Sequence, residues 1–482
     1  MPTWPTSQRR PRRSRFTIVT ERPIIVIGGG VAGSVVAGTL ARECSAPIVV
    51  LESGSSAGAL SEPESRTLSF VEALARPSTR RDDLVVRRTA RQEPKGYPAG
   101  SGIGGSGEIN ALVASWGMKH DVESWGDGLA VELQAGLRSL PHELRTANEG
   151  EWGPMDRALV DSCVDVGVAR NDALWNDTTS PEGVGTVTLF ARGDRRSTGV
   201  DALLKQAIAA GRVRVDRNSR VHRLLVRDDV VRGVELSSGV TLEARAVVVC
   251  AGAFESVEIL QRTGVLPACV RGVQDHPAVA FVTRDPVAQS SVLSIGAIGR
   301  LSVGSRVGNV HLVSMNATAP GEHSHPALLV ALMDVESRGS ITLHEDGSVA
   351  RELAMLSTER ERRTLGAAVR RCVEIVARIE DRLGTEMHLS ERTESVRWLA
   401  SATDAEVEDW LVTTSGVYAH AASSVPLGGE FLDLRGAVRT VDGLWVADAS
   451  VMPTLISGNP TLTVAALARV IAREVAGVTA AS

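Results

Sequence analysis

The segment between residues 22 and 52 constrains the fold of this chain more than any other. A β-branched run at 22–27 leads into a glycine-rich turn, Gly28-Gly29-Gly30-Val31-Ala32-Gly33, which fits the pattern G-x-G-x-x-G. Small residues follow at 34–43, and a second apolar run, Ile48–Leu51, ends at Glu52. A strand, a glycine turn, a helix and a second strand in this order predict the βαβ unit of a Rossmann-like sheet that binds a dinucleotide.

The glycines of this turn have separate physical tasks. Gly28 permits the tight turn, Gly30 lets the backbone approach a pyrophosphate, and Gly33 lets the helix pack closely on the strand. The N-terminus of the helix adds N–H groups and partial positive charge for the phosphates. Glu52 can accept hydrogen bonds from a ribose, and an acid here favours FAD or NAD over NADP. The predicted cofactor-binding residues of this unit are Gly28, Gly30, Val31, Ala32, Gly33 and Glu52.

The residues before this unit are basic. Five arginines lie within the first fifteen residues, and residues 24–41 then carry no charge, an order that superficially resembles an export signal. Five glycines in that run would make a poor isolated helix. We therefore predict a disordered basic tail at 1–20 and a cytoplasmic protein. The tail is interpreted as a solvated arm, with weak association with the inner face of the membrane as the alternative.

Composition excludes several classes of function. The 52 basic and 57 acidic residues give a net charge of −5, which does not attract a polyanion, and only 3% of residues are aromatic, so no nucleic-acid partner is expected. The five cysteines form no C-x-x-C, and His323 and His325 lack acidic partners at metal-binding spacing. We predict no disulfide framework, no metal and no transmembrane segment.

Motifs later in the chain separate FAD from NAD. Residues 102–110 read GIGGSGEIN, residues 252–256 read GAFES ahead of Thr-Gly-Val at 263–265, and residues 274–277 read QDHP. Near the C-terminus, GLWVADASVMP at 443–453 precedes SGNP at 457–460. These motifs, in this order over nearly the whole chain, resemble the signatures of the glucose-methanol-choline (GMC) oxidoreductases.

The resemblance implies an α/β FAD-binding Rossmann-like domain and an α+β substrate domain built on an antiparallel sheet. Residues 21–150, 191–275 and 421–482 are expected in the FAD-binding domain, and residues 151–190 and 276–420 in the substrate-binding domain. The family's covalent flavin linkage uses a histidine before the signature asparagine, and Ile109 stands here. Noncovalent FAD is therefore expected. The further cofactor-binding residues that the resemblance implies are Gly104, Gly105, Ser106, Asn110, Val221, Asp448, Ala449, Pro460 and Thr461.

The resemblance also implies the catalytic residues. Oxidation of an alcohol by hydride transfer to flavin N5 needs a base with a pKa near neutral, and His420 lies at the family's first catalytic position. Asn459 lies where the family has histidine or asparagine, and it would bind the substrate oxygen. Asn459 before Pro460 also reads as the N-cap of a helix, and both roles stay open.

The residues after His420 and the residue His276 need separate comment. The family often reads His-Pro-x-Gly-Thr-Cys where residues 420–425 read HAASSV, so the lost glycine puts the local geometry in question. His276 in the QDHP motif is predicted to be structural, at the crossover between the domains.

The implied function is an FAD-dependent alcohol dehydrogenase or oxidase. The short chain, in which three of 52 basic residues are lysine, also resembles small actinobacterial members that accompany the redox cofactor mycofactocin. That implies reduced mycofactocin (mycofactocinol) as substrate and a quinone or protein as respiratory electron acceptor. The alternatives are a generic small-alcohol oxidase, a redox-idle FAD-containing lyase, a flavin-holding interaction protein and, ranked lowest, an NAD-dependent dehydrogenase. Few aromatic residues argue against a choline-binding cage.

Overall fold

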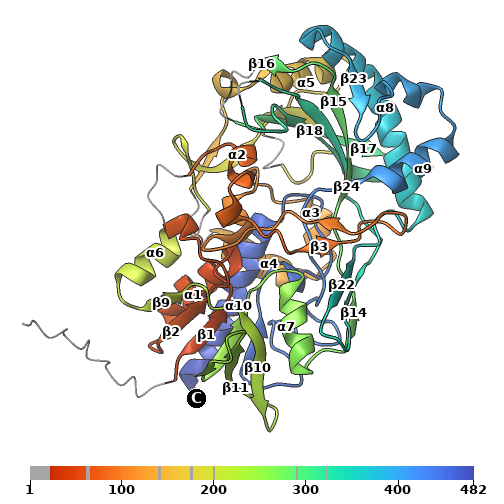
Figure 1. The fold of residues 1–482 in the computed structure, drawn as a ribbon. Helices are drawn as coiled ribbons and strands as arrows, with labels where there is room; N and C mark the ends of the chain where they lie inside the picture. Colours follow the sequence, from red (N-terminus) through yellow and green to blue (C-terminus); the bar gives the residue numbers. More distant parts are fainter. Residues whose placement is uncertain are drawn as a thin grey trace, which may run out of the picture.

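The computed structural model describes most of the chain (Figure 1). It covers residues 22–60, 66–138, 140, 143–173, 177–198, 201–288, 291, 293–321 and 323–481. The basic tail predicted at 1–20 lies outside the described residues. Within the described residues, no helix is long and apolar enough to cross a membrane.

One of the two large sheets is parallel and contains strands from both ends of the sequence. Its strand order is β25-β13-β1-β2-β9, and every pairing in it is parallel. The strands β1, β2 and β13 are buried at every position, as expected of continuous apolar runs covered on both faces. The bounds are β1 Ile24–Ile27, β2 Ile48–Leu51, β9 Val213–Asp216, β13 Ala246–Val249 and β25 Leu444–Val446.

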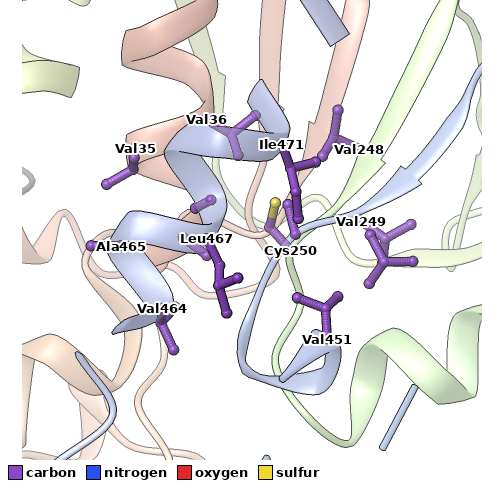
Figure 2. Close-up of a cluster of buried hydrophobic side chains, with 14 of the residues drawn as sticks. Val35, Val36, Val248, Val249, Cys250, Val451, Val464, Ala465, Leu467 and Ile471 are labelled. Carbon is purple, nitrogen blue, oxygen red and sulfur yellow. The ribbon is translucent and has the colours of Figure 1, made fainter. Parts of the chain in front are cut away.

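Two helices that are far apart in the sequence pack together on this sheet. Helix α1, Val31–Glu43, contacts α10, Thr461–Ala481, at the C-terminal end of the chain. Figure 2 shows side chains of both helices beside Val248 and Val249 of β13, within one continuous apolar core. The core therefore joins the N-terminal and C-terminal motifs. Helix α6, Asp201–Ala209, contacts α1 as well.

The second sheet is antiparallel, in the order β23-β15-β20-β18-β17-β6, with β24 also paired to β15. The combination of a parallel and an antiparallel sheet confirms the predicted fold class. The bounds are β6 Gly183–Thr186, β15 Pro277–Thr283, β17 Ala297–Val303, β18 Arg306–Met315, β20 Ala327–Leu332, β23 Met387–Leu389 and β24 Gly416–Val417.

Helices cover one face of the antiparallel sheet. Helix α8, Glu359–Leu383, begins after Thr358, whose hydroxyl accepts from the Glu361 backbone N–H, and ends at Gly384 with φ +68°. It packs on α5, Pro154–Asp165, and on α9, Asp404–Thr414. Figure 1 shows these helices beside the antiparallel sheet. Buried side chains of the helices and the sheet form a second apolar core.

Shorter elements complete the two halves. The β-meander β10-β11-β12 borders β13, and α7 packs on β10. The remaining helices are α2 Phe70–Leu74, α3 Lys119–Glu123, α4 Asp127–Arg138 and α7 Glu255–Thr263. The remaining strands are β3 Val85–Val86, β4 Lys95–Gly96, β5 Leu144–Thr146, β7 Thr188–Arg192, β8 Arg195–Arg196, β10 Val221–Arg227, β11 Val230–Leu236, β12 Thr241–Glu243, β14 Cys269–Arg271, β16 Val287–Ala288, β19 His323–Ser324, β21 Ser340–Leu343 and β22 Val349–Glu352.

Candidate active site

A cavity of about 690 Å³ is lined by residues from both sheets. Ile27, Leu51 and Cys250 line it at the C-terminal ends of β1, β2 and β13. Val313 of β18 and Leu329 of β20 line it from the antiparallel sheet. Ligands of open α/β sheets bind at the carboxyl ends of the strands, so this cavity is where the sequence pattern predicts a dinucleotide.

The glycine turn after β1 has the predicted shape. Gly28 has φ +99°, and a Cβ there would overlap the carbonyl oxygen of Cys250, which directly follows β13. A Cβ at Gly33 would overlap the carbonyl oxygen of Gly28, so the helix can approach the strand only with glycine at both positions. Gly28, Gly30, Val31 and Ala32 line the cavity, whereas Gly33 lies behind it as a packing residue.

The Glu52 carboxylate is held by backbone donors at the end of β2. It is 6% exposed. Its Oε2 accepts from the N–H of Gly29 at 2.8 Å, and its Oε1 accepts from Gly54 at 2.7 Å and from Gly102 at 3.1 Å. Glu52 therefore joins the first glycine turn to the second glycine-rich segment while it lines the cavity.

The second glycine-rich segment lies against the first. The Gly104 N–H donates to the Gly29 carbonyl oxygen at 2.8 Å, and Gly104 forms a parallel bridge with Gly30. Gly105, Ser106 and Asn110 line the cavity, but Gly104 does not. The predicted cofactor-binding residues are thus brought to one place, with Gly33 and Gly104 one layer behind the surface. Ile109, at the position of the family's linking histidine, lines the cavity as well.

The remaining predicted cofactor-binding residues also line the cavity. Asp448 Oδ2 accepts from the Gly252 N–H at 2.8 Å and from the Ser256 hydroxyl at 2.5 Å. These bonds tie the C-terminal motif to the turn after β13. The five residues of this group are Val221, Asp448, Ala449, Pro460 and Thr461.

His420 and Asn459 meet at the cavity. His420 is 9% exposed, and its Nε2 lies 3.4 Å from the Asn459 amide Nδ2. Helix α10 begins at Thr461, so the residue before it is Pro460, and the Asn459 side chain faces His420. The Pro460 carbonyl oxygen accepts the first helical hydrogen bond, from the Val464 N–H at 2.8 Å, so Pro460 and not Asn459 directly precedes the helix.

His276 contacts His420 on the other side of the ring. The two Nδ1 atoms are 3.1 Å apart, and the ring planes are nearly perpendicular at 88°. Burial lowers the pKa of His276 to about 3, and burial together with the neighbouring His276 ring lowers the pKa of His420 well below 6.5. Both imidazoles are neutral at pH 7. Each neutral ring carries one proton, so one Nδ1 donates and the other accepts.

Asp275 anchors this histidine pair. Its Oδ1 accepts from the backbone N–H groups of His276 at 2.7 Å and His420 at 2.9 Å. Its Oδ2 accepts from the Tyr97 hydroxyl at 2.7 Å, and that hydroxyl accepts from the Ala421 N–H at 2.9 Å. These hydrogen bonds lower the pKa of Asp275, but complete burial has the larger effect and raises it to about 6. The carboxylate therefore fixes the backbone on both sides of the pair.

The glycine that the family has after its histidine is Ser423 here, and the backbone keeps a glycine-like conformation. Ser423 has φ +65°, in the left-handed region that serine rarely adopts. Its backbone N–H donates to the Ala449 carbonyl oxygen at 3.0 Å, and its buried hydroxyl has no hydrogen-bond partner among the described residues. The loop geometry survives the loss of glycine at the cost of local strain.

Sequence reasoning missed several residues of this network. His276 was predicted to be structural at the domain crossover, and its contact with the His420 ring was not predicted. Tyr97 and Asp275 were not singled out, and neither was Tyr418, whose ring packs against His420 with centroids 4.2 Å apart. The QDHP motif was the available signal for Asp275 and His276. Among the described residues, no group of three or more His, Cys, Asp or Glu side chains could hold a metal ion.

The residues present fit FAD. Gly30 caps helix α1 without a side-chain hydrogen bond, and a Cβ at Gly30 would have only the Gly105 Cα near it, at 3.9 Å. An anionic pyrophosphate is favoured at such an open helix N-terminus. The cavity runs on from this turn to His420 and Asn459, so a ligand bound at the turn can extend to the histidine.

Comparison with known proteins agrees with the geometry. Models of the GMC oxidoreductase family match residues 23–278 and 335–468. The oxygen-dependent choline dehydrogenase of Acinetobacter baumannii (strain AYE) is 25% identical, over 95% of this chain and 97% of the relative. The 5-(hydroxymethyl)furfural oxidase of Methylovorus sp. (strain MP688) is 24% identical, over 93% of this chain and 97% of the relative.

Solved structures show the same fold. Pyridoxine 4-oxidase from Mesorbium loti matches with a TM-score of 0.81 and 24% identity, covering 94% of this chain and 99% of that chain. A formate oxidase from Aspergillus oryzae RIB40 matches with a TM-score of 0.81 and 15% identity, over 96% and 99% of the two chains. With the family models matching more than half of the residues, the chain belongs to the GMC oxidoreductase family, and FAD is its cofactor.

Proposed function

We propose that this chain oxidises an alcohol with FAD, with His420 as the base and Asn459 as a ligand of the substrate oxygen. The observation that carries the proposal is the convergence of a neutral buried histidine and an amide on the cavity that the glycine turn also lines. When bound, oxidised FAD supplies the hydride acceptor for the carbon of the alcohol.

The histidine pair supports a basic Nε2 on His420. If His420 carries its proton on Nδ1 and donates it to His276 Nδ1, then His420 Nε2 is an acceptor. An amide nitrogen is a donor only, so Asn459 Nδ2 beside His420 Nε2 is consistent with that tautomer. His420 Nε2 can then take the hydroxyl proton of a substrate held in the cavity.

Asn459 and Tyr418 support binding of the substrate oxygen. Asn459 Oδ1 and the Tyr418 hydroxyl are buried polar atoms beside the same cavity. Burial raises the pKa of Tyr418, so this hydroxyl stays protonated and is available as a donor. A donor close to the reacting oxygen stabilises the negative charge that develops as the proton leaves.

The proposal also includes a substrate, an electron acceptor, a location and domain boundaries. Chain length and the three lysines favour reduced mycofactocin as the alcohol, with a quinone or protein as the next electron acceptor. The scattered cysteines favour the cytoplasm. The division of the chain at residues 150, 190, 275 and 420 is proposed as the domain boundary set.

The experiment is an anaerobic visible spectrum of the holoprotein before and after addition of alcohol donors. The panel contains primary aliphatic alcohols, benzyl alcohol and reduced mycofactocin. Loss of the oxidised flavin absorption with one donor supports the proposal and identifies its substrate class. If the bound flavin stays oxidised with every donor, alcohol oxidation is ruled out for this panel. The chain is then better interpreted as a redox-idle lyase or a flavin-holding protein.

A further inference from the structure

We infer that the substrate is an uncharged alcohol with an apolar body, and that cationic alcohols such as choline are rejected. This inference rests on the proposed function and adds the substrate class. It follows from the wall that the antiparallel sheet presents to the cavity, from the charges around that wall and from the placement of polar groups.

The sheet presents aliphatic side chains to the cavity. Val313 of β18 pairs directly with Leu329 of β20, and paired residues point to the same face. Met315 lies two residues further along β18 and shares that face. All three line the cavity. Val313 belongs to the apolar core that surrounds the parallel sheet, and Leu329 packs against that core. We call Val313, Met315 and Leu329 the aliphatic wall.

The opposite face of the same strands is occupied by helices. Leu312 pairs with Val330, and both belong to the second core together with α5 and α8. Strand register therefore assigns the aliphatic wall to the cavity side. Side chains alternate between the two faces along each strand. A one-residue shift in the register of these strands would therefore turn the aliphatic wall toward the helices.

The acidic residues that line the cavity are already engaged elsewhere. Glu52 accepts from three backbone N–H groups, and Asp448 accepts from Gly252 and Ser256. Glu255 forms ion pairs with Arg81 at 2.5 Å and Arg220 at 3.2 Å. These are the carboxylates among the described lining residues, and none belongs to the aliphatic wall. A bound ammonium group would lack an opposite charge at the wall.

A buried arginine, Arg300, lies on the cavity-side face of the sheet. Arg300 of β17 pairs with His311, which lies two residues before Val313 on β18. Arg300 is 1% exposed, and its Nη1 donates to the carbonyl oxygens of Asp177 and Ser180. Burial, and after it the Arg300 charge, lower the pKa of His311, and the carboxylates of Asp177 and Asp121 act on Arg300 itself. Arg300 therefore adds no negative charge that could attract an ammonium group to the wall.

Of the phenylalanine and tyrosine side chains that line the cavity, all except Phe70 pack against another ring. The Tyr418 ring packs against His420 with centroids 4.2 Å apart and a tilt of 35°, and Tyr97 packs edge-on against Phe254 at 5.1 Å. An ammonium-binding cage needs several ring faces directed at one point. The polar groups at this end are instead those of Tyr418, His420 and Asn459, which suit one hydroxyl group. One polar corner opposite an aliphatic wall fits a neutral alcohol.

The test uses two isosteric alcohols and the wild-type holoenzyme. Choline and 3,3-dimethylbutan-1-ol differ in having a nitrogen cation or a neutral carbon at the branching atom. We expect the second-order rate constant of anaerobic flavin reduction to be at least about 100-fold larger for the neutral alcohol, because an ammonium loses hydration without a partner. Equal rate constants, or a preference for choline, would overturn the inference.

A binding measurement keeps this test separate from turnover. The tertiary alcohol 2,4,4-trimethylpentan-2-ol and its trimethylammonium isostere have no hydrogen on the hydroxyl-bearing carbon, so they bind without being oxidised. Perturbation of the flavin spectrum gives their dissociation constants. Tighter binding of the neutral compound supports the inference even if no alcohol reduces the flavin. A flavin that no alcohol reduces contradicts only the proposed function. Tighter binding of the cation overturns the inference.

A matched pair of variants tests the aliphatic wall itself. Leu329→Glu and Leu329→Gln have the same size and differ in charge, and Leu329 is only half-buried. We expect choline to bind at least about tenfold more tightly to Leu329→Glu than to Leu329→Gln, as one opposite charge close to the ammonium allows. Identical choline affinities in the two folded variants would show that Leu329 does not face the substrate, which contradicts the inference.

Discussion

The Nδ1 atoms of His276 and His420 lie 3.1 Å apart, although the residues are 144 positions apart in the sequence. His276 directly precedes β15 of the antiparallel sheet, and His420 follows β24, which pairs with the start of β15. The contact therefore depends on the place where the antiparallel sheet meets the loop that returns to the FAD-binding half. We predict from this contact that His276 positions the ring of the proposed base.

Replacement of His276 tests this positioning role. His276→Leu removes the acceptor for the His420 Nδ1 proton, and we expect flavin reduction to slow by about 10- to 100-fold. His276→Asn keeps an acceptor close to the former Nδ1 and should recover most of that loss. Rate constants and their pH profiles in anaerobic stopped-flow experiments measure both effects. Equal loss in the two variants would indicate that His276 serves packing alone.

The pH dependence of flavin reduction follows from the pKa of His420. Burial lowers that pKa well below 6.5, so the base stays neutral as the pH falls through 7 and is protonated only in more acidic solution. We expect the rate constant to be flat from pH 8 down through 6.5 and to fall only in more acidic solution. An acidic limb with an apparent pKa of 6.5 or higher would contradict a buried base whose pKa is lowered.

Asp275 provides the control for that profile. Its pKa is raised to about 6 by burial, so its own titration falls near the acidic limb. In Asp275→Asn the carboxylate charge beside the histidines is lost, which disfavours the protonated imidazole. The limb of His420 should then move to lower pH. A limb that disappears entirely in Asp275→Asn would assign it to the carboxylate.

Ser423 tests the strain in the loop after His420. With φ +65° and a buried hydroxyl that has no partner among the described residues, serine is unfavourable there. Ser423→Gly should raise the free energy of unfolding by about 1 kcal/mol, after the greater unfolded-state entropy of glycine is subtracted. Ser424→Gly is the matched control, because the Ser424 hydroxyl donates to the Ala253 carbonyl oxygen at 2.6 Å. The control should lower stability, and loss in both variants would refute the strain.

The mode of flavin attachment has a direct test. Ile109 lines the cavity at the family's linking position and offers no atom for a covalent bond. Denaturation in acid or guanidinium should release all of the yellow chromophore into the filtrate. Flavin that stays with the precipitated protein would show a covalent link at another residue.

Local parts of this structure were predictable from the sequence. The βαβ unit at 24–51 and helix α8 depend on short-range signals: β-branched runs, obligatory glycines, a threonine cap and apolar residues at helical spacing. The fold class followed from motifs spread along the chain. The cofactor-binding residues were reached through the resemblance, and the structure gathers them around one cavity, with Gly33 and Gly104 behind its surface.

The parts that escaped prediction depend on long-range pairing. The aliphatic wall exists because β18 and β20 pair in one register, which alternation along either strand alone does not specify. The contact of His276 with His420, and the bond of Tyr97 to Asp275, join segments that meet only in the folded chain. The division into domains at the predicted boundaries stays a prediction.

The central claim is that His420 is the base for alcohol oxidation, and its removal tests this most directly. His420→Ala should keep bound FAD, because the glycine turn and Glu52 lie elsewhere in the cavity, and should lose flavin reduction by the alcohol by about three or more powers of ten. The measurement is anaerobic stopped-flow absorbance of the variant and the wild type with the same donor. A variant that binds FAD and is reduced at the wild-type rate would contradict the account.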